Sequence, residues 1–348
     1  MLLTIGLLAL LVVTAFLFSV EICLRRSATR VRAKTSPSPT QSSAIEHEDV
    51  DYEYERDRHD LDRYAQSAGL SGREWREQRL TFASPTINFD DGWRRTPSPP
   101  QQSTSNVYVF GSSTVLSLEV RDDQTLPAAL QRRLSLTSSD LRVLNRGMSG
   151  ANVKMCLREL SDERLAPSDI VVVMFGVIDA KALGYPQRGK GLLGAIPGYV
   201  AFLGLLRVRL RLQLAQLIWR ATVQRDLSKS TSISHQNATE VLATLTSMRQ
   251  IALSHGATLI AVLEPHLWEK RLSTAEARLA RRYLTSTPQM LETQYRSFRN
   301  VLANQHYFFD LSQVFVDDDE TLFQDWSHTN ARGNVKLADA LCRLVIAS

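Results

Sequence analysis

Short, largely apolar segments alternate with longer amphipathic segments through most of the chain, and this alternation limits the possible folds more than any other feature. Five segments have the length and composition of buried strands: Asn106–Phe110, Leu141–Leu144, Ile170–Phe175, Thr258–Leu263 and Tyr307–Phe309. Three segments with helical periodicity accompany them: Thr125–Leu136, Asn237–His255 and Arg332–Val345. Such alternation predicts an α/β fold with a central parallel sheet covered by helices on both faces.

The first three predicted strands run directly into turns that contain glycine and polar residues. These turns are Gly111-Ser112-Ser113, Asn145-Arg146-Gly147 and Gly176-Val177-Ile178-Asp179. Ligands of open parallel sheets bind beyond the carboxyl ends of the strands. We therefore expect a functional site where these turns meet, although each turn by itself also fits an ordinary connection.

A carboxylate and an imidazole lie three residues apart near the C-terminus, at Asp325 and His328. At this spacing the carboxylate can accept the imidazole N–H and fix the tautomer of the ring. The other ring nitrogen is then free to take a proton from a serine hydroxyl. The same spacing also suits a helix-capping pair, so the other motifs are needed to decide between the two.

Together and in this order, the motifs resemble the SGNH (GDSL-type) hydrolase superfamily. Gly111-Ser112-Ser113 is similar to its first block, Gly147 to the glycine of the second, Gly176–Asp179 to the third, and Asp325-x-x-His328 to the last. The resemblance is closest to a bacterial membrane-anchored branch, on Asp122-Asp123-Gln124-Thr125-Leu126-Pro127 and Pro265-His266-Leu267. It implies a flavodoxin-like three-layer α/β/α sandwich, together with a role for each matched residue.

The resemblance implies that Ser113 is the nucleophile, that His328 is the general base and then the acid, and that Asp325 orients His328. It implies an oxyanion hole made of the N–H groups of Ser113 and Gly147 and of an asparagine side chain in the third block. Ile178 stands at that asparagine position and has no side-chain donor. The loss of one preorganised donor typically costs ~3–4 kcal/mol of transition-state stabilisation.

Three interpretations of Ile178 remain open. The two N–H groups suffice, or Asn145 or Asn152 supplies the missing donor, or the protein has kept binding and lost hydrolysis. Asp179 and His266 are further candidates for the wall of the substrate cleft.

An uncharged apolar run extends from Leu2 to Val20, which is nearly long enough to cross the ~30 Å hydrocarbon core of a bilayer. A cleaved signal peptide is the alternative, but no Lys or Arg precedes the run. We therefore predict that residues 1–24 form an N-terminal transmembrane helix, a single-pass anchor. The positive-inside rule would keep the following domain in the cytoplasm, whereas the family resemblance implies export.

Residues 25–62 are predicted to be a tether. It begins with a basic collar, continues through a Ser/Pro-rich linker, and ends in an acidic stretch at 46–62 with nine acidic residues and two arginines, which we interpret as solvated spacer. A helical lead-in is expected from Tyr64 to Trp93. Residues 63–348 are then one SGNH hydrolase-like domain.

The domain contains an apolar and arginine-rich insertion at 186–235, either a packed helical insertion or a lid lying in the membrane interface. The net charge of +5 comes from the basic collar and this insertion. The arginine-rich stretch of the insertion, from Arg207 to Arg225, offers only Trp219 as a stacking aromatic, so we expect no nucleic-acid partner. The three cysteines lack metal-ligand spacing and no glycine-rich phosphate loop is found, so no metal or cofactor is expected.

The sequence therefore predicts a membrane-anchored serine esterase, an acyl-ester hydrolase that acts through an acyl-Ser113 intermediate. The expected substrate is an acetylated glycan or a lipid ester, and membrane lipid is the expected partner of the anchor. An O-acyltransferase with the same triad is one alternative. A non-catalytic binding protein with the SGNH fold is another, and Ile178 is the residue that favours it.

Overall fold

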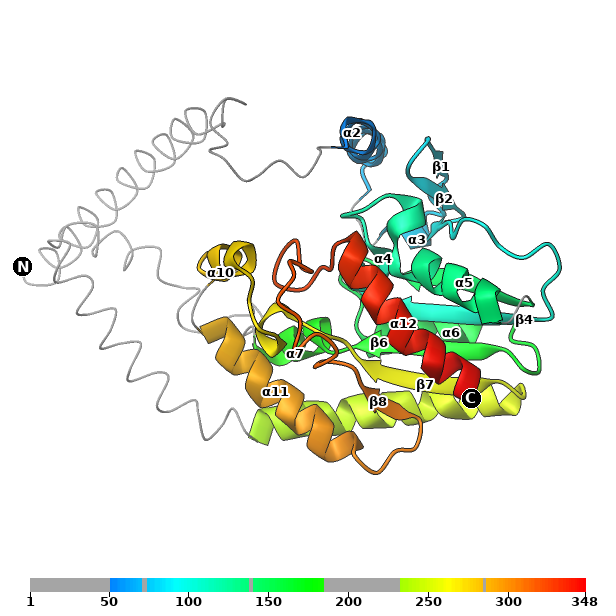
Figure 1. Ribbon diagram of the computed structural model, residues 1–348. Coiled ribbons are helices and arrows are strands. Elements are labelled where there is room, and N and C mark those ends of the chain that lie inside the picture. Colours follow the sequence, from blue (N-terminus) through cyan, green and yellow to red (C-terminus); the bar gives the residue numbers. More distant parts are fainter. Residues whose placement is uncertain (1–50, 71–73, 138–139, 185–231, 284–285) are drawn as a thin grey trace, which may run out of the picture. The chain divides into compact units, whose positions relative to one another are not determined.

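A five-stranded parallel sheet forms the centre of the molecule, with strand order β5-β4-β6-β7-β8 (Figure 1). The computed structural model describes residues 51–70, 74–137, 140–184, 232–283 and 286–348, which all belong to one compact unit. The strands are β4 (Ser105–Gly111), β5 (Leu141–Gly147), β6 (Ile170–Phe175), β7 (Thr258–Leu263) and β8 (Phe308–Asp310). The predicted central parallel sheet is confirmed.

Helices cover both faces of this sheet, which gives the three-layer sandwich. One face packs against α5 (Leu126–Thr137) and α12 (Ala331–Ala347) (Figure 1). The other packs against α6 (Val153–Asp162), a helix at 232–254 and α11 (Ser286–Leu302). Strand β6 is uniformly apolar because both of its faces are buried. Val171 and Val173 pack into the core on one face of the sheet, and Val172 and Met174 pack into the core on the other.

The strand order places the ends of β4 and β6 side by side at a reversal of the chain path. After β4 the chain moves outward to β5 and then returns to the opposite side of β4 with β6. The connections beyond these two strands therefore diverge at the carboxyl edge of the sheet, where open parallel sheets bind ligands. The turn before α4 (Ser113–Leu116) and the turn before α7 (Val177–Gly184) lie at this edge.

The region before β4 differs from the predicted spacer and helical lead-in. The structure has α2 (Tyr52–Ser67), α3 (Glu74–Glu77) and a small antiparallel sheet of β1 (Phe82–Ala83), β2 (Asn88–Asp90) and β3 (Trp93–Arg94). The boundary predicted at residue 62 is wrong, because α2 begins inside the acidic stretch and buries one face. Its buried residues recur at helical spacing: Tyr54, Asp57, Leu61 and Ala65.

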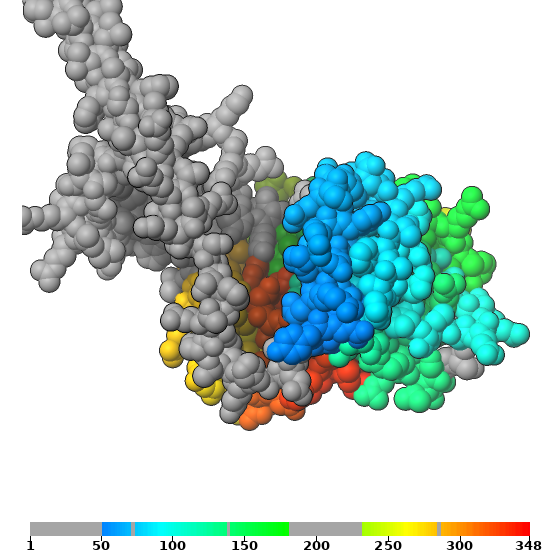
Figure 2. Space-filling model, turned by 90° about the horizontal axis from the view of Figure 1, so that it is seen from above, coloured from blue at the N-terminus to red at the C-terminus, as the bar shows by residue number. Residues whose placement is uncertain are grey.

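Helix α2 is attached to the domain by its own acidic and aromatic side chains. Asp57 is buried and accepts hydrogen bonds from the backbone N–H and the hydroxyl of Thr86, at 3.0 and 2.8 Å. Tyr54 donates its hydroxyl to the carbonyl of Leu118. In Figure 2, α2 (blue) lies against the cyan residues that follow it. Asp57 therefore serves packing, whereas Glu53 and Glu55 of the same helix are exposed to solvent.

Shorter elements complete the described part: η1 (Asp122–Gln124), η3 (Leu267–Glu269) and α10 (Thr274–Ala280). Among the described residues, none of the helices has both the length and the apolar character needed to span a bilayer. The predicted anchor at 1–24, the tether up to residue 50 and the predicted insertion up to residue 231 lie outside the described residues.

Candidate active site

The side chains of Ser113, His328 and Asp325 lie within hydrogen-bonding distance of one another, in that order, at the carboxyl edge of the sheet. Ser113 begins α4 directly after β4, and its Oγ lies 2.8 Å from Nε2 of His328. Nδ1 of His328 lies 2.6 Å from Oδ2 of Asp325. This network assigns the ring proton to Nδ1, which leaves Nε2 as an acceptor for the serine hydroxyl.

The loop before α12 fixes the carboxylate that orients this ring. Oδ1 of Asp325 accepts the backbone N–H groups of Ser327 and His328, at 2.7 and 2.8 Å. Burial alone would raise the pKa of Asp325, but hydrogen bonds from His328 and these N–H groups bring it to about 2. Asp325 is therefore ionised near neutral pH and favours a positive charge on the ring.

The charge on His328 is controlled by opposing effects. Burial alone would lower the pKa of His328, because it disfavours the charged ring. The hydrogen bond to Asp325 and the nearby Glu119 carboxylate outweigh burial, and the pKa lies above its usual value of 6.5. The imidazole is thus a stronger base than a free histidine.

The N–H of Gly147 already has a partner, contrary to the expectation that it is free for an oxyanion. It donates to Oδ1 of Asn145 at 2.9 Å, and Nδ2 of Asn145 donates to the carbonyl of Val115 at 3.2 Å. Asn145 is buried, so its side chain links the end of β5 to α4. A Cβ on Gly147 would collide with the backbone of Leu116, and glycine is required here for that close packing.

The third turn supplies no side-chain donor at Ile178, which is partly buried against the core. Asp179, next to it, is buried and accepts the N–H groups of Gly176 and Val153, at 3.2 and 3.0 Å. Burial raises the pKa of Asp179 despite these bonds. Its carboxylate therefore ties the second and third turns together.

Asn152 caps α6 and accepts the N–H of Met155 at 3.1 Å, so its side-chain oxygen is engaged. Asn152 and Asp179 line a pocket of about 170 Å³ with Asn237 and Lys154, and no triad residue lines it. We find no support in these contacts for Asn152 as the substitute donor.

His266 is buried away from the triad contacts. Its Nδ1 accepts the N–H of Trp268 at 3.3 Å, and its ring meets Tyr295 edge to face. Burial lowers the pKa of His266 to about 4, which keeps the ring neutral. Among the described residues, no hydrogen bond or ring contact joins it to Ser113 or His328, so these contacts fit a packed structural histidine.

Glu264 is a functional candidate that the sequence did not single out. It follows β7 directly, is fully buried, and accepts the hydroxyl of Thr114 at 2.5 Å and the N–H of Val177 at 2.9 Å. It therefore links the nucleophile turn to the third turn. A polar residue at the carboxyl end of a buried strand is the signal that would have identified it.

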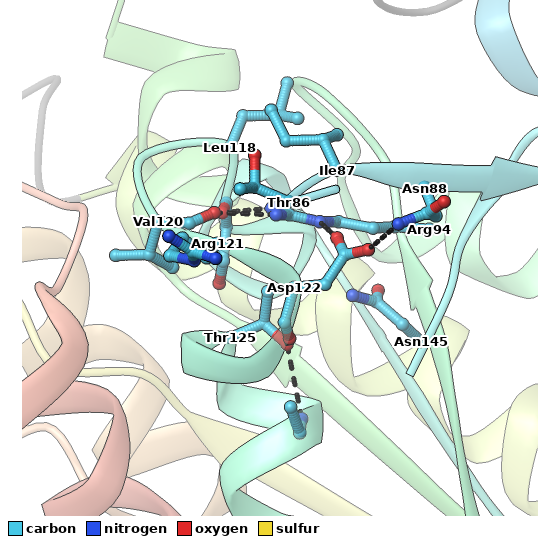
Figure 3. Close-up of polar contacts among 12 residues, drawn as sticks. Thr86, Ile87, Asn88, Arg94, Leu118, Val120, Arg121, Asp122, Thr125 and Asn145 are labelled. Atoms are coloured by element: carbon cyan, nitrogen blue, oxygen red, sulfur yellow. Dashed lines mark hydrogen bonds and ion pairs between the residues drawn. The ribbon is translucent and has the colours of Figure 1, made fainter. Parts of the chain in front are cut away.

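Arg94, also missed, fixes the chain just after α4 (Figure 3). The side chain is completely buried and pairs with Asp122 at 2.8 Å. Its guanidinium also donates to three carbonyl oxygens: those of Leu116, Ser117 and Val120. Burial raises the pKa of Asp122 in spite of Arg94, and Asn88 donates to its second oxygen at 2.9 Å. The small N-terminal sheet thus determines the course of residues 116–122.

Comparison with known proteins gives structural neighbours of low sequence identity. No family model and no curated protein matches the chain. A G-D-S-L family lipolytic protein from Veillonella parvula is 12% identical, with a TM-score of 0.41, over 69% of this chain and 98% of its own. A carbohydrate acetylesterase from Sinorhizobium meliloti is 12% identical, with a TM-score of 0.39, over 70% and 99%. A lipase/acylhydrolase from Enterococcus faecalis is 16% identical, with a TM-score of 0.40, over 70% and 95%.

Proposed function

We propose that this chain is a serine hydrolase that cleaves esters through an acyl-Ser113 intermediate. The observation that carries the proposal is the row Ser113–His328–Asp325, with 2.8 and 2.6 Å between its hydrogen-bonding atoms. A capping pair of Asp325 and His328 would not require Nε2 to face a serine hydroxyl. The three side chains lie at the carboxyl edge of a parallel sheet, which is where such folds bind ligands.

The geometry supports a two-step acyl transfer. Ser113 Oγ attacks the ester carbonyl carbon while His328 Nε2 takes the hydroxyl proton, and a tetrahedral oxyanion forms. When this species collapses, the bond to the alcohol oxygen breaks and Nε2 returns the proton to that oxygen. A water molecule then attacks acyl-Ser113 and gives its proton to Nε2. When the acyl–Oγ bond breaks, Nε2 returns that proton to Ser113 Oγ, and the acid is released.

The proposed substrate is an acetylated glycan or a lipid ester. An O-acyltransferase is the closest alternative, because an alcohol in place of water would receive the acyl group from the same intermediate. Two observations favour a non-catalytic binding protein as the second candidate: Ile178 offers no donor, and the N–H of Gly147 is bonded to Asn145.

A fluorophosphonate probe tests this function directly, since it labels only an activated serine. The expected result is labelling of the unmodified protein, none of Ser113→Ala, and much slower labelling of His328→Ala. Ser254→Ala, at an exposed serine outside the site, should label normally. Absence of labelling in the unmodified protein, or equal labelling of Ser113→Ala, would end the hydrolase proposal.

We also propose that residues 1–24 anchor the enzyme in a membrane as a single-pass helix. The uncharged run and the basic residues after it support this. The side that the domain faces follows from a protease-protection experiment on sealed vesicles. If the experiment shows an exported domain, envelope glycans are favoured as the substrate. If it shows a cytoplasmic domain, lipid or cytosolic esters are favoured.

A further inference from the structure

Glu119 is a carboxylate outside the triad that lies near the same His328 nitrogen as the serine hydroxyl and helps to raise the pKa of that ring. Its Oε1 lies 3.7 Å from Nε2 of His328, and Oγ of Ser113 lies 2.8 Å from that nitrogen. A separation of 3.7 Å is too long for a hydrogen bond. Glu119 therefore stands beside the reacting groups without being bound to them.

The main chain around Glu119 is held from three directions. Its carbonyl accepts the side-chain amide of Gln324 at 3.0 Å, from the loop that carries the histidine. The carbonyl of Leu118 accepts Arg58 at 2.9 Å, and that of Val120 accepts Arg94 at 2.6 Å. The direction of the Glu119 side chain is thus set by the fold.

Among the described residues, the donor that acts on the Glu119 carboxylate is its own backbone N–H. In the part of the chain that the structure describes, no other side chain donates a hydrogen bond to it, and its Oε2 is buried without a partner. Oε2 is closed to solvent, whereas the side chain as a whole is 27% exposed. Keeping such a group unpaired costs free energy, which a ligand hydroxyl can offset.

The charges that surround Glu119 come from α2 and from the loop before α12. Burial raises the pKa of Glu119, His328 and Arg58 act to lower it, and Asp325 acts to raise it. Either protonation state keeps a carboxyl oxygen that accepts a hydrogen bond from a hydroxyl group. Recognition of a hydroxyl therefore does not require a full negative charge.

The location of Oε1 relative to Nε2 defines the part of the substrate it meets. Nε2 must come within hydrogen-bonding distance of the alcohol oxygen when it returns the proton. A group beside Nε2 is then close to the atoms attached next to that oxygen. We propose that Glu119 is a specificity residue that binds a hydroxyl adjacent to the ester oxygen, so that the site selects esters of polyols such as sugars. This inference rests on the proposed esterase function.

Two acetates that differ by one hydroxyl test the inference: cyclohexyl acetate and the monoacetate of cis-cyclohexane-1,2-diol. Release of the alcohol is measured, because it reports acylation of Ser113 whichever acceptor then takes the acyl group. The full-length protein should prefer the diol ester in kcat/KM by about 10-fold or more, the usual size of one well-placed polar contact. Glu119→Ala should lose about 10- to 100-fold on the diol ester and less than about 3-fold on cyclohexyl acetate.

Two variants sharpen the result. Glu119→Gln keeps a carbonyl acceptor and should retain part of the preference. Glu53→Ala removes an exposed glutamate of α2 and should leave both rates unchanged. Equal losses of Glu119→Ala on the two esters, or no preference in the unmodified protein, would overturn the inference while leaving the esterase function intact. If the unmodified protein releases neither alcohol and is not labelled by the fluorophosphonate, the function fails and the inference falls with it.

Discussion

At the scale of single residues, Asp325 determines how basic His328 is. Burial would lower the pKa of His328, but its hydrogen bond to Asp325 raises the pKa by more than burial lowers it, with help from the Glu119 carboxylate. Because the neutral ring is the active base, activity is lost as the pH falls through this pKa. We expect kcat/KM to rise with an apparent pKa above 6.5 in the unmodified protein. In Asp325→Asn the apparent pKa should shift downward, and kcat should fall by about 10³- to 10⁴-fold.

The measurement is the pH dependence of p-nitrophenyl acetate hydrolysis, with Asp339→Asn as a control at an exposed carboxylate of α12. An unchanged apparent pKa in Asp325→Asn would contradict the pairing that the geometry shows.

Substitution of Ile178 is predicted to raise kcat, whereas substitution of Asp325 is predicted to lower it. If the third turn faces the oxyanion, as the family resemblance implies, an amide donor at this position should stabilise the transition state. Ile178→Asn is expected to raise kcat on p-nitrophenyl acetate by about 10- to 100-fold, a conservative share of what one such donor provides. Ile178→Leu, which stays apolar, should show no gain. A folded Ile178→Asn with unchanged kcat would show that the asparagine role is not available at this position.

The sequence made some site residues visible and left others hidden. Asp325 and His328 were found because their contact is local, three residues apart, and Ser113 because it directly follows a strand. Glu119 carries no local pattern, since its position depends on the return of residues 116–122 around Arg94. The bond between Asn145 and the N–H of Gly147 was likewise hidden, because sequence does not tell whether a donor is already satisfied.

At the scale of elements, Arg94 connects the small sheet to the nucleophile helix, and its removal should be costly. Arg94→Met would leave Asp122 and three carbonyl oxygens without their donor in a buried place. Breaking one side of a buried ion pair typically destabilises by about 3–5 kcal/mol. The free energy of unfolding, measured by urea denaturation, should fall by that amount.

The neighbouring residue provides the control for this change. Arg95 pairs with Asp90 at 2.9 Å but is 54% exposed, and Arg95→Met should lower the free energy of unfolding by no more than about 1 kcal/mol. Equal losses in Arg94→Met and Arg95→Met would show that burial of the network does not matter. Activity should fall in Arg94→Met even well below its unfolding midpoint, because the segment that carries Glu119 loses its support.

The main elements were predictable where burial alone determines the pattern. The predicted strands Ile170–Phe175 and Thr258–Leu263 agree with the structure at both ends, since β6 and β7 lie inside the sheet. The small antiparallel sheet was not predicted, because its strands have two or three residues and carry no period. The acidic composition of residues 46–62 indicates spacer, yet residues 52–62 form the first part of α2, whose buried positions follow a helical period.

At the scale of the whole molecule, the charge of +5 belongs to the N-terminal basic collar and the insertion at 186–235 more than to the described unit. The basic collar after Leu2–Val20 and the arginine-rich segment both lie outside the described residues. Arginines in the described unit are largely bound in pairs, such as Arg146 with Glu163 and Arg299 with Asp310. We propose that this basic charge meets an anionic membrane surface rather than a nucleic acid.

The proposed anchor leads to the last prediction. In cells that express the full chain, the unmodified protein should stay in the membrane pellet after extraction at high pH. Leu8→Arg combined with Leu11→Arg places two charges near the middle of the apolar run. Each charge there opposes insertion by about 2.5–3.5 kcal/mol, so the double variant should move to the soluble fraction. Leu136→Arg, at a leucine that is already 77% exposed in the catalytic unit, should remain in the pellet. Retention of the double variant would contradict an anchor at residues 1–24 and would shift the membrane contact to another part of the chain.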